Sequence, residues 1–192
     1  MDYFAKAAQI LVNFAFVLLI SLIVLRVLLQ CVRANFYNPV CQFLYKVTNP
    51  VLMPMRRLVP PWRNLDLAGV LLAFVLSAIK LYALYALDGR PPGLAGLPLM
   101  ALADLADFVL MLYFGLILVR VLLSFVKVDH ANPVVPLIYQ LADPVLRPLR
   151  KRLPPVSGLD LSPMIAMLVI LLARVLLVGP VLDLGLQLAQ GG

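Results

Sequence analysis

The sequence predicts an all-α integral membrane protein with four transmembrane helices, arranged as two tandem parallel two-helix repeats. Of the 192 residues, 64% are hydrophobic and the mean hydropathy is +1.02, which is too apolar for a core enclosed by a solvated surface. Four separate segments are apolar enough to cross a bilayer, and the sequence repeats itself after 94 positions. We therefore expect most of the apolar surface to face lipid.

The four expected spans cover roughly residues 8–30, 67–88, 104–126 and 162–182. Each is close to the twenty or so helical residues that cross about 30 Å of hydrocarbon. The first resembles a signal peptide in having Lys6 before it, but its apolar run from Ile10 to Leu25 is long and no small-residue cleavage pattern follows. We expect it to remain as the first membrane helix.

An internal duplication is the strongest pattern. Arg26–Gly69 aligns without a gap to Arg120–Pro163, with 19 identities. Each unit holds two spans, so both units point the same way across the membrane. The expected units are residues 1–94 and 95–192.

Charge distribution predicts the orientation. The first and third connections each hold five Lys or Arg residues, whereas the second holds only Arg90. Basic loops resist translocation, so connections one and three are expected in the cytoplasm and both termini in the periplasm. Lys6 is an exception, because it is a basic residue near the N-terminus, on the side expected to be periplasmic.

Between its two spans each unit carries an apolar, proline-rich linker, Asn38–Val59 in one and Asn132–Leu153 in the other. Asn or Asp before Pro is typical of a helix N-cap followed by the first helical residue, so two short helices are expected in each linker. These helices either lie in the interface or are re-entrant. The expected caps and turns are Asn38-Pro39, Asn49-Pro50, Asn132-Pro133 and Asp143-Pro144.

Basic residues gather at the ends of both linkers, where they can meet anionic lipid headgroups or simply mark topology. This cluster comprises Arg56, Arg57, Arg150, Lys151 and Arg152. The lipid bilayer is the expected partner, together with a membrane protein or a second copy of the chain. Nucleic acid is not expected, because the basic runs lack interleaved aromatic residues.

Four cations lie inside the expected spans and are equivalent between the repeats: Arg26 with Arg120, and Lys80 with Arg174. A charge at mid-membrane costs about 2.5 to 3.5 kcal/mol on insertion scales, so each needs an explanation. The arginines near the linkers can extend to the interface. The two deeper cations require a counter-charge, and Asp107 is the best candidate for Lys80 or Arg174.

Asp66 and Asp160 directly precede the second span of each repeat. The simpler interpretation is that they cap these helices, with Ser162 as a cap and Pro163 as the first helical residue at the start of the second one. The alternative is that Asp66 holds Arg26 or Arg56, and that Asp160 holds Arg120 or Arg150.

The repeated elements Arg-Val-Leu-Leu, Asn-Pro, Pro-Val-Leu-x-Pro-x-Arg and Leu-Asp-Leu resemble those of the YggT family in its two-unit bacterial form. The Asp-x-Ser-Pro element is intact at Asp160–Pro163, whereas Ala68 and Gly69 replace Ser-Pro in the first repeat. The resemblance implies a bacterial inner (plasma) membrane location. It also implies a link to osmotic or ion homeostasis, cell division or membrane-complex assembly, without a shared catalytic residue.

The sequence favours a non-enzymatic scaffold or assembly factor in envelope organisation, division or membrane-complex biogenesis. It offers no catalytic constellation and no cofactor or metal motif: His130 lacks ligand partners at suitable spacing, and Cys31 and Cys41 are expected to be free thiols. The alternative is an ion channel or transporter-like protein in osmotic or ion homeostasis. Four spans make a thin pore, so that alternative requires an oligomer or a partner.

Overall fold

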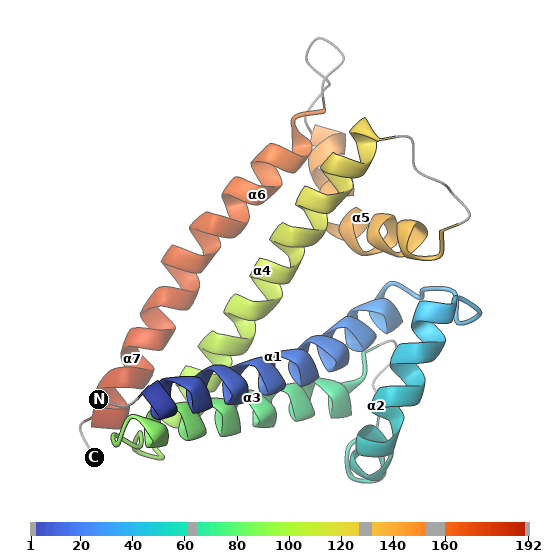
Figure 1. Cartoon of the computed structure of the whole chain (residues 1–192). Helices are drawn as coiled ribbons and strands as arrows, with labels where there is room; N and C mark the ends of the chain where they lie inside the picture. The colour runs from blue at the N-terminus through green and yellow to red at the C-terminus, as the bar shows by residue number, and fades with distance from the viewer. Residues whose placement is uncertain (1–2, 61–64, 127–131, 153–159, 191–192) are drawn as a thin grey trace.

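The structure is a computed structural model that describes residues 3–60, 65–126, 132–152 and 160–190. All regular elements in these ranges are helices (Figure 1). They are α1 (Tyr3–Cys31), α2 (Pro39–Leu58), α3 (Leu67–Leu87), α4 (Leu97–Phe125), α5 (Val134–Arg152), α6 (Ser162–Ala173), the π-helix η1 (Arg174–Val178) and α7 (Gly179–Gln190).

Four helices are long and apolar enough to cross a membrane, namely α1, α3, α4 and the continuous run Ser162–Gln190. Three of these have 29 residues, about 43 Å at 1.5 Å per residue, and are longer than the expected spans. Hydropathy identifies only the part of a helix that crosses the hydrocarbon. The same helix can continue into the polar headgroup region, because its backbone hydrogen bonds are formed within the helix. The helix α4 therefore begins at Leu97, near Pro98 in its first turn, and not at residue 104.

The fourth membrane helix contains one wide turn. The backbone N–H of Gly179 donates to the carbonyl of Arg174, five residues earlier, which defines η1. Pro180 follows directly, and its ring cannot fit a regular α-helical turn without a clash. The wide turn lets the helix continue to Gln190.

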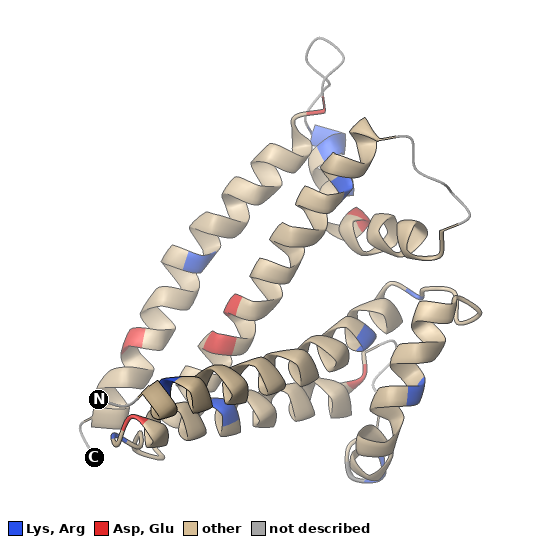
Figure 2. Ribbon diagram, viewed as in Figure 1, with Lys and Arg blue, Asp and Glu red and all other residues tan. Residues whose placement is uncertain are grey.

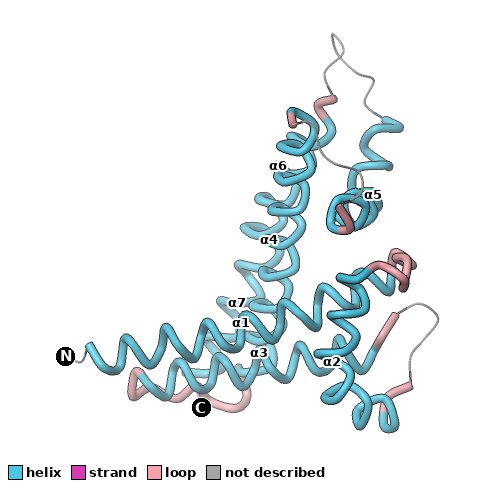
Figure 3. Tube along the Cα trace, turned by 45° about the vertical axis from the view of Figure 1, so that its right-hand side comes forward, coloured by secondary structure: helices cyan, strands magenta, loops and turns pink. Residues whose placement is uncertain are grey.

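The expectation of two short helices per linker is wrong for the described residues. Single helices, α2 and α5, run through Pro50 and Pro54 and through Pro144 and Pro148. Proline removes one N–H donor and crowds the preceding turn, which bends a helix but need not end it when the flanking turns are packed. Both linker helices are visibly bent in Figures 1 and 3.

The membrane helices form two hairpins. One contains α1 and α3, the other α4 and the α6–η1–α7 run. In Figure 1 the hairpins diverge from a shared end near both termini, and Figure 3 shows that the second hairpin crosses the first, with the N-terminal part of α1 continuing past the crossing. The linker helices α2 and α5 lie at the opposite end. Both repeats thus run in the same direction away from the shared end.

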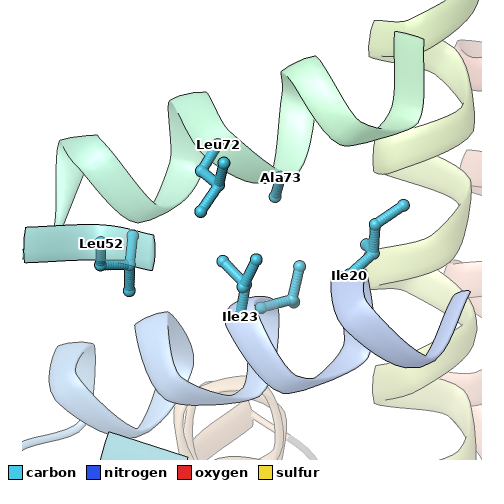
Figure 4. Close-up of a cluster of buried hydrophobic side chains, with 6 residues drawn as sticks. Ile20, Ile23, Leu52, Leu72 and Ala73 are labelled. Carbon is cyan, nitrogen blue, oxygen red and sulfur yellow. The ribbon is translucent and has the colours of Figure 1, made fainter. Parts of the chain in front are cut away.

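Equivalent residues build the core of each hairpin. Ile23, Leu52 and Leu72 pack together in the first repeat, with Leu52 reaching in from α2 (Figure 4). Their counterparts 94 positions later, Ile117, Leu146 and Ala166, pack together in the second. A third cluster joins the repeats through Leu29, Leu44, Leu137 and Leu141. The duplicated sequence therefore produces duplicated packing, with the linker helices at the junction.

Candidate functional site: charged residues between the membrane helices

Two groups of charged and polar residues contact one another across helices, and Figure 2 marks where the Lys, Arg and Asp residues lie along the ribbon. We call the first the termini-side cluster; it consists of Ser77, Lys80, Asp104, Asp107 and Arg174. We call the second the linker-side ion pairs; they are Arg56–Asp66, Arg120–Asp143 and Arg150–Asp160.

Within the termini-side cluster, Lys80 of α3 donates to Asp104 of α4 at 2.7 Å. The hydroxyl of Ser77, one turn before Lys80, donates to the other oxygen of Asp104. The Lys80 side chain is 8% exposed, so its charge is withdrawn from the surroundings and neutralised by a carboxylate from the other repeat. This contact ties the two hairpins together.

Arg174, at the start of η1, forms a two-pronged contact with Asp107 of α4. Its Nε donates to one carboxylate oxygen at 2.5 Å and its Nη2 to the other at 3.0 Å. This fork geometry is the strongest common arrangement of guanidinium and carboxylate. A cavity of about 560 Å³ adjoins the cluster and is lined partly by Tyr85, Asp104 and Arg174.

Of the two deep cations, Arg174 is therefore the one that meets Asp107. The sequence does not single out Asp104 as the partner of Lys80. Asp104 is the first residue of the expected span 104–126, so it reads as a residue at the end of a helix. The detectable signal was the spacing: Asp104 and Asp107 are three residues apart and share one helix face.

On the linker side, Asp66 is fully buried and accepts from Arg56 at 2.5 Å and from the backbone of Gly69 at 3.3 Å. It therefore caps α3 and holds Arg56 at the same time. Asp160 likewise accepts from Arg150 at 2.7 Å and from the backbone N–H of Ser162 at 3.0 Å. Asp66 therefore combines the cap and the ion pair that the sequence offered as alternatives. Asp160 holds Arg150 and accepts from the first N–H of α6, but Leu161 occupies the N-cap position.

Ser162 does not serve as a cap. The helix α6 begins at Ser162 itself, and its buried hydroxyl makes no hydrogen bond to the described residues. Burial by itself would raise the pKa of Asp160, but the contacts with Ser162 and Arg150 outweigh it and hold that pKa below its ordinary value.

The linker caps divide into two kinds. Asn38 accepts from the backbone of Val40 at 2.9 Å and caps α2, and Asn132 accepts from Val134 at 3.0 Å just before α5. Asn38 also donates to the carbonyl of Pro133 at 2.7 Å, which links the starts of the two linker helices.

Asn49 and Asp143 lie inside continuous helices and do not cap second ones. Instead, each meets the intramembrane arginine of its own repeat. Asp143 accepts from Arg120 at 2.7 Å, and Asn49 accepts from Arg26 at 3.5 Å. Arg26 also donates to Thr48 at 2.6 Å. Both arginines are buried and are held by side chains of the linker helices.

Aromatic rings complete both arginine sites. The guanidinium of Arg26 lies 4.6 Å from the ring centre of Tyr45, and that of Arg120 lies 4.8 Å from the ring centre of Tyr139. Cation–π contacts of this kind strengthen when water is excluded. The two tyrosines are equivalent between the repeats, so the alignment of the repeats marks both positions.

The remaining basic residues stay near the surface. Arg57, Lys151 and Arg152 are exposed at the ends of α2 and α5, where cations also interact favourably with the helix dipole. In the part of the chain that the structure describes, these three side chains form no salt bridge.

Four apolar helices in two tandem units, with Lys80, Arg120 and Arg174 paired to carboxylates across helix contacts, define a multi-pass helical membrane protein. The model of the CCB3/YggT family matches the chain twice, over residues 5–87 and 99–181. The chain belongs to the CCB3/YggT family.

Relatives with similar sequences span most of the chain. An uncharacterized protein of Vibrio alginolyticus is 36% identical over 92% of this chain and 97% of its own length. One from Pseudomonas aeruginosa is 35% identical over 84% of this chain and 83% of its own length, and YggT of Escherichia coli K12 is 36% identical over 77% of each. No solved structure matches the chain.

Proposed function

We propose that the chain is a non-enzymatic scaffold or assembly factor of the bacterial inner membrane, active in envelope organisation, division or membrane-complex biogenesis. One observation carries the proposal: the two deep cations each form an ion pair with a carboxylate of α4. These charges stabilise helix contacts and leave the helix faces free for lipid and partner proteins.

The linker helices supply the surface that a scaffold needs. On α2, Leu44 and Leu52 are buried, whereas Phe43, Val47 and Val51 are exposed apolar residues beside the exposed Arg57. Such a mixture suits anionic headgroups together with a membrane-protein partner or a second copy of the chain. Both termini are proposed to be periplasmic, with α2 and α5 on the cytoplasmic side.

Site-specific photocrosslinking in cells tests this function. A crosslinker placed at exposed Val51 is expected to yield discrete protein adducts, while the same group at neighbouring buried Leu52 yields none. Adducts of equal yield at both positions, or only with lipid, would contradict a protein scaffold.

A channel or transporter role in osmotic or ion homeostasis is the second candidate, favoured by the cavity of about 560 Å³ beside Asp104 and Arg174. Ion flux from proteoliposomes under an osmotic or voltage step separates the two. The scaffold proposal expects equal, background flux from the wild type and from a Lys80→Ala/Arg174→Ala variant. Flux whose selectivity changes in the variant would establish the second candidate.

A further inference from the structure

A cavity of about 340 Å³ opens between the end of α1, the loop that follows it and α2. Three arginines, Arg26, Arg33 and Arg56, lie on its wall. The rest of the wall is mainly apolar or aromatic and includes Leu29, Phe36, Leu44 and Tyr45. The cavity therefore places guanidinium groups beside an apolar surface.

Arg26, on the wall of this cavity, has different partners from its counterpart in the second repeat. Its equivalent, Arg120, is neutralised by Asp143, but the first repeat has Asn49 at that position. Among the residues that the structure describes, Arg26 donates only to the neutral oxygens of Thr48 and Asn49. Arg26 makes no direct ion pair among these contacts; the Asp66 carboxylate acts on it only through space and is itself bound to Arg56. An added anion is attracted strongly to such a buried guanidinium in a site of low dielectric.

Arg56 adds a second donor. Its Nη2 holds Asp66, but its buried Nε makes no hydrogen bond to the described part of the chain. Arginine presents its N–H groups as a planar fork that matches the oxygens of a phosphate group. Arg56 is thus anchored at one edge and keeps one buried N–H group without a partner in the described part of the chain.

We propose that this cavity binds a phosphate group, either from the headgroup of an anionic phospholipid or from a soluble phosphate ester. The guanidinium of Arg26 supplies the main charge, with Arg56 as an additional donor. The apolar wall accommodates the carbon portion attached to the phosphate. This inference does not depend on whether the chain is a scaffold or a channel.

In the second repeat, a carboxylate occupies the corresponding region. A larger cavity of about 640 Å³ lies beside α5, but its wall includes Asp143 together with Arg147 and Lys151. The carboxylate of Asp143 already accepts a hydrogen bond from Arg120 at 2.7 Å and lies 3.8 Å from the guanidinium of Arg147. A phosphate group would meet a carboxylate there, so the binding site belongs to the first repeat.

Exchanging Asn49 and Asp143, the residues that differ between the repeats at this position, tests the proposal. The full-length chain in detergent is titrated with short-chain phosphatidylglycerol, phosphatidylcholine or glycerol 3-phosphate, and binding is measured by native mass spectrometry. We compare the wild type with Asn49→Asp, which gives Arg26 the carboxylate found in the second repeat, and with the reciprocal Asp143→Asn.

The wild type is expected to prefer phosphatidylglycerol over phosphatidylcholine, and Asn49→Asp is expected to weaken binding about tenfold, the loss typical of one charge-assisted contact. Asp143→Asn should bind at least as tightly as the wild type. Binding of glycerol 3-phosphate would identify a soluble ester as the ligand, and its absence beside phosphatidylglycerol binding would identify the lipid.

A second pair of variants tests the same site if Asn49→Asp does not fold. Gln30→Glu places a negative charge on the wall of the proposed site, and Gln140→Glu does the same in the larger cavity. Only Gln30→Glu is expected to weaken binding. Equal affinity in all variants, or binding to none of the three ligands, would overturn the proposal.

Discussion

At the scale of single residues, the notable feature is how each charge inside the membrane region is accommodated. Arg174 and Lys80 meet carboxylates of α4, while Arg26 and Arg120 meet side chains of the linker helices. An unpaired charge in hydrocarbon is costly, so these contacts offset most of the penalty of placing the cation there. The folded state depends on them in a way that substitution can measure.

Replacing Asp107 by Leu should destabilise the protein by about 2 kcal/mol, because Arg174 then keeps its charge without a counter-charge. The double variant Asp107→Leu/Arg174→Leu should recover most of that loss. Unfolding in mixed detergent micelles measures both. If the single variant is as stable as the wild type, the contact does not support the fold.

The Arg150–Asp160 pair should make stability depend on pH. The folded pKa of Asp160 lies below its ordinary value of about 4, so the ionised carboxylate favours the folded state at neutral pH. This contribution is lost as the pH falls through the folded pKa. The unfolding temperature of the wild type should therefore fall more steeply below about pH 5 than that of Asp160→Asn; parallel curves would contradict the assignment.

At the scale of elements, the close approach of α4 and α7 depends on glycine. A Cβ on Gly96 would collide with the backbone of Gly185 and Ala189, and a Cβ on Gly185 would collide with Met100. The backbone of Gly93 also donates to the carbonyl of Ala189 at 3.1 Å. Small residues allow membrane helices to pack this closely without a hydrophobic driving force between them.

We expect Gly185→Leu to separate α7 from α4 and to lower the unfolding temperature clearly. Gly115→Leu is the matched control, because nothing lies within 4 Å of a Cβ at that position of α4. Thermal unfolding in detergent compares the two. Equal unfolding temperatures would mean that α4 and α7 are not in close contact.

Sequence reasoning identified the helices and the duplication because apolar length and repeated residues are local signals. It pointed to the contact between Arg174 and Asp107, which the structure brings together. It missed Asp104 and the arginine-binding roles of Asn49 and Asp143, because those depend on which faces of bent helices meet. An Asn-Pro pair looks the same at a helix start and at a bend inside a packed helix.

At the scale of the whole molecule, two hairpins diverge from a shared end and are joined again through the linker helices (Figure 1). Leu44 and Leu141 pack together at the linker side, and Lys80 meets Asp104 nearer the termini. The repeats are therefore connected at two separated levels, which is suited to a rigid platform.

Cysteine labelling tests the proposed orientation. In a Cys31→Ser/Cys41→Ser background, Tyr37→Cys before α2 should be protected from a membrane-impermeant maleimide in intact spheroplasts, whereas Arg90→Cys should react. Both should react after permeabilisation. The reverse pattern would place the linker helices outside the cell.

The most direct test of the central claim, that the intramembrane charges hold the helices together, is a charge swap between Lys80 and Asp104. Accumulation in the membrane and unfolding temperature are measured for Lys80→Asp, Asp104→Lys and the double variant. Each single variant should lose stability, because two like charges then face each other, and the double variant should regain most of it. Single variants that match the wild type, or a double variant that is worse than both, would contradict the account.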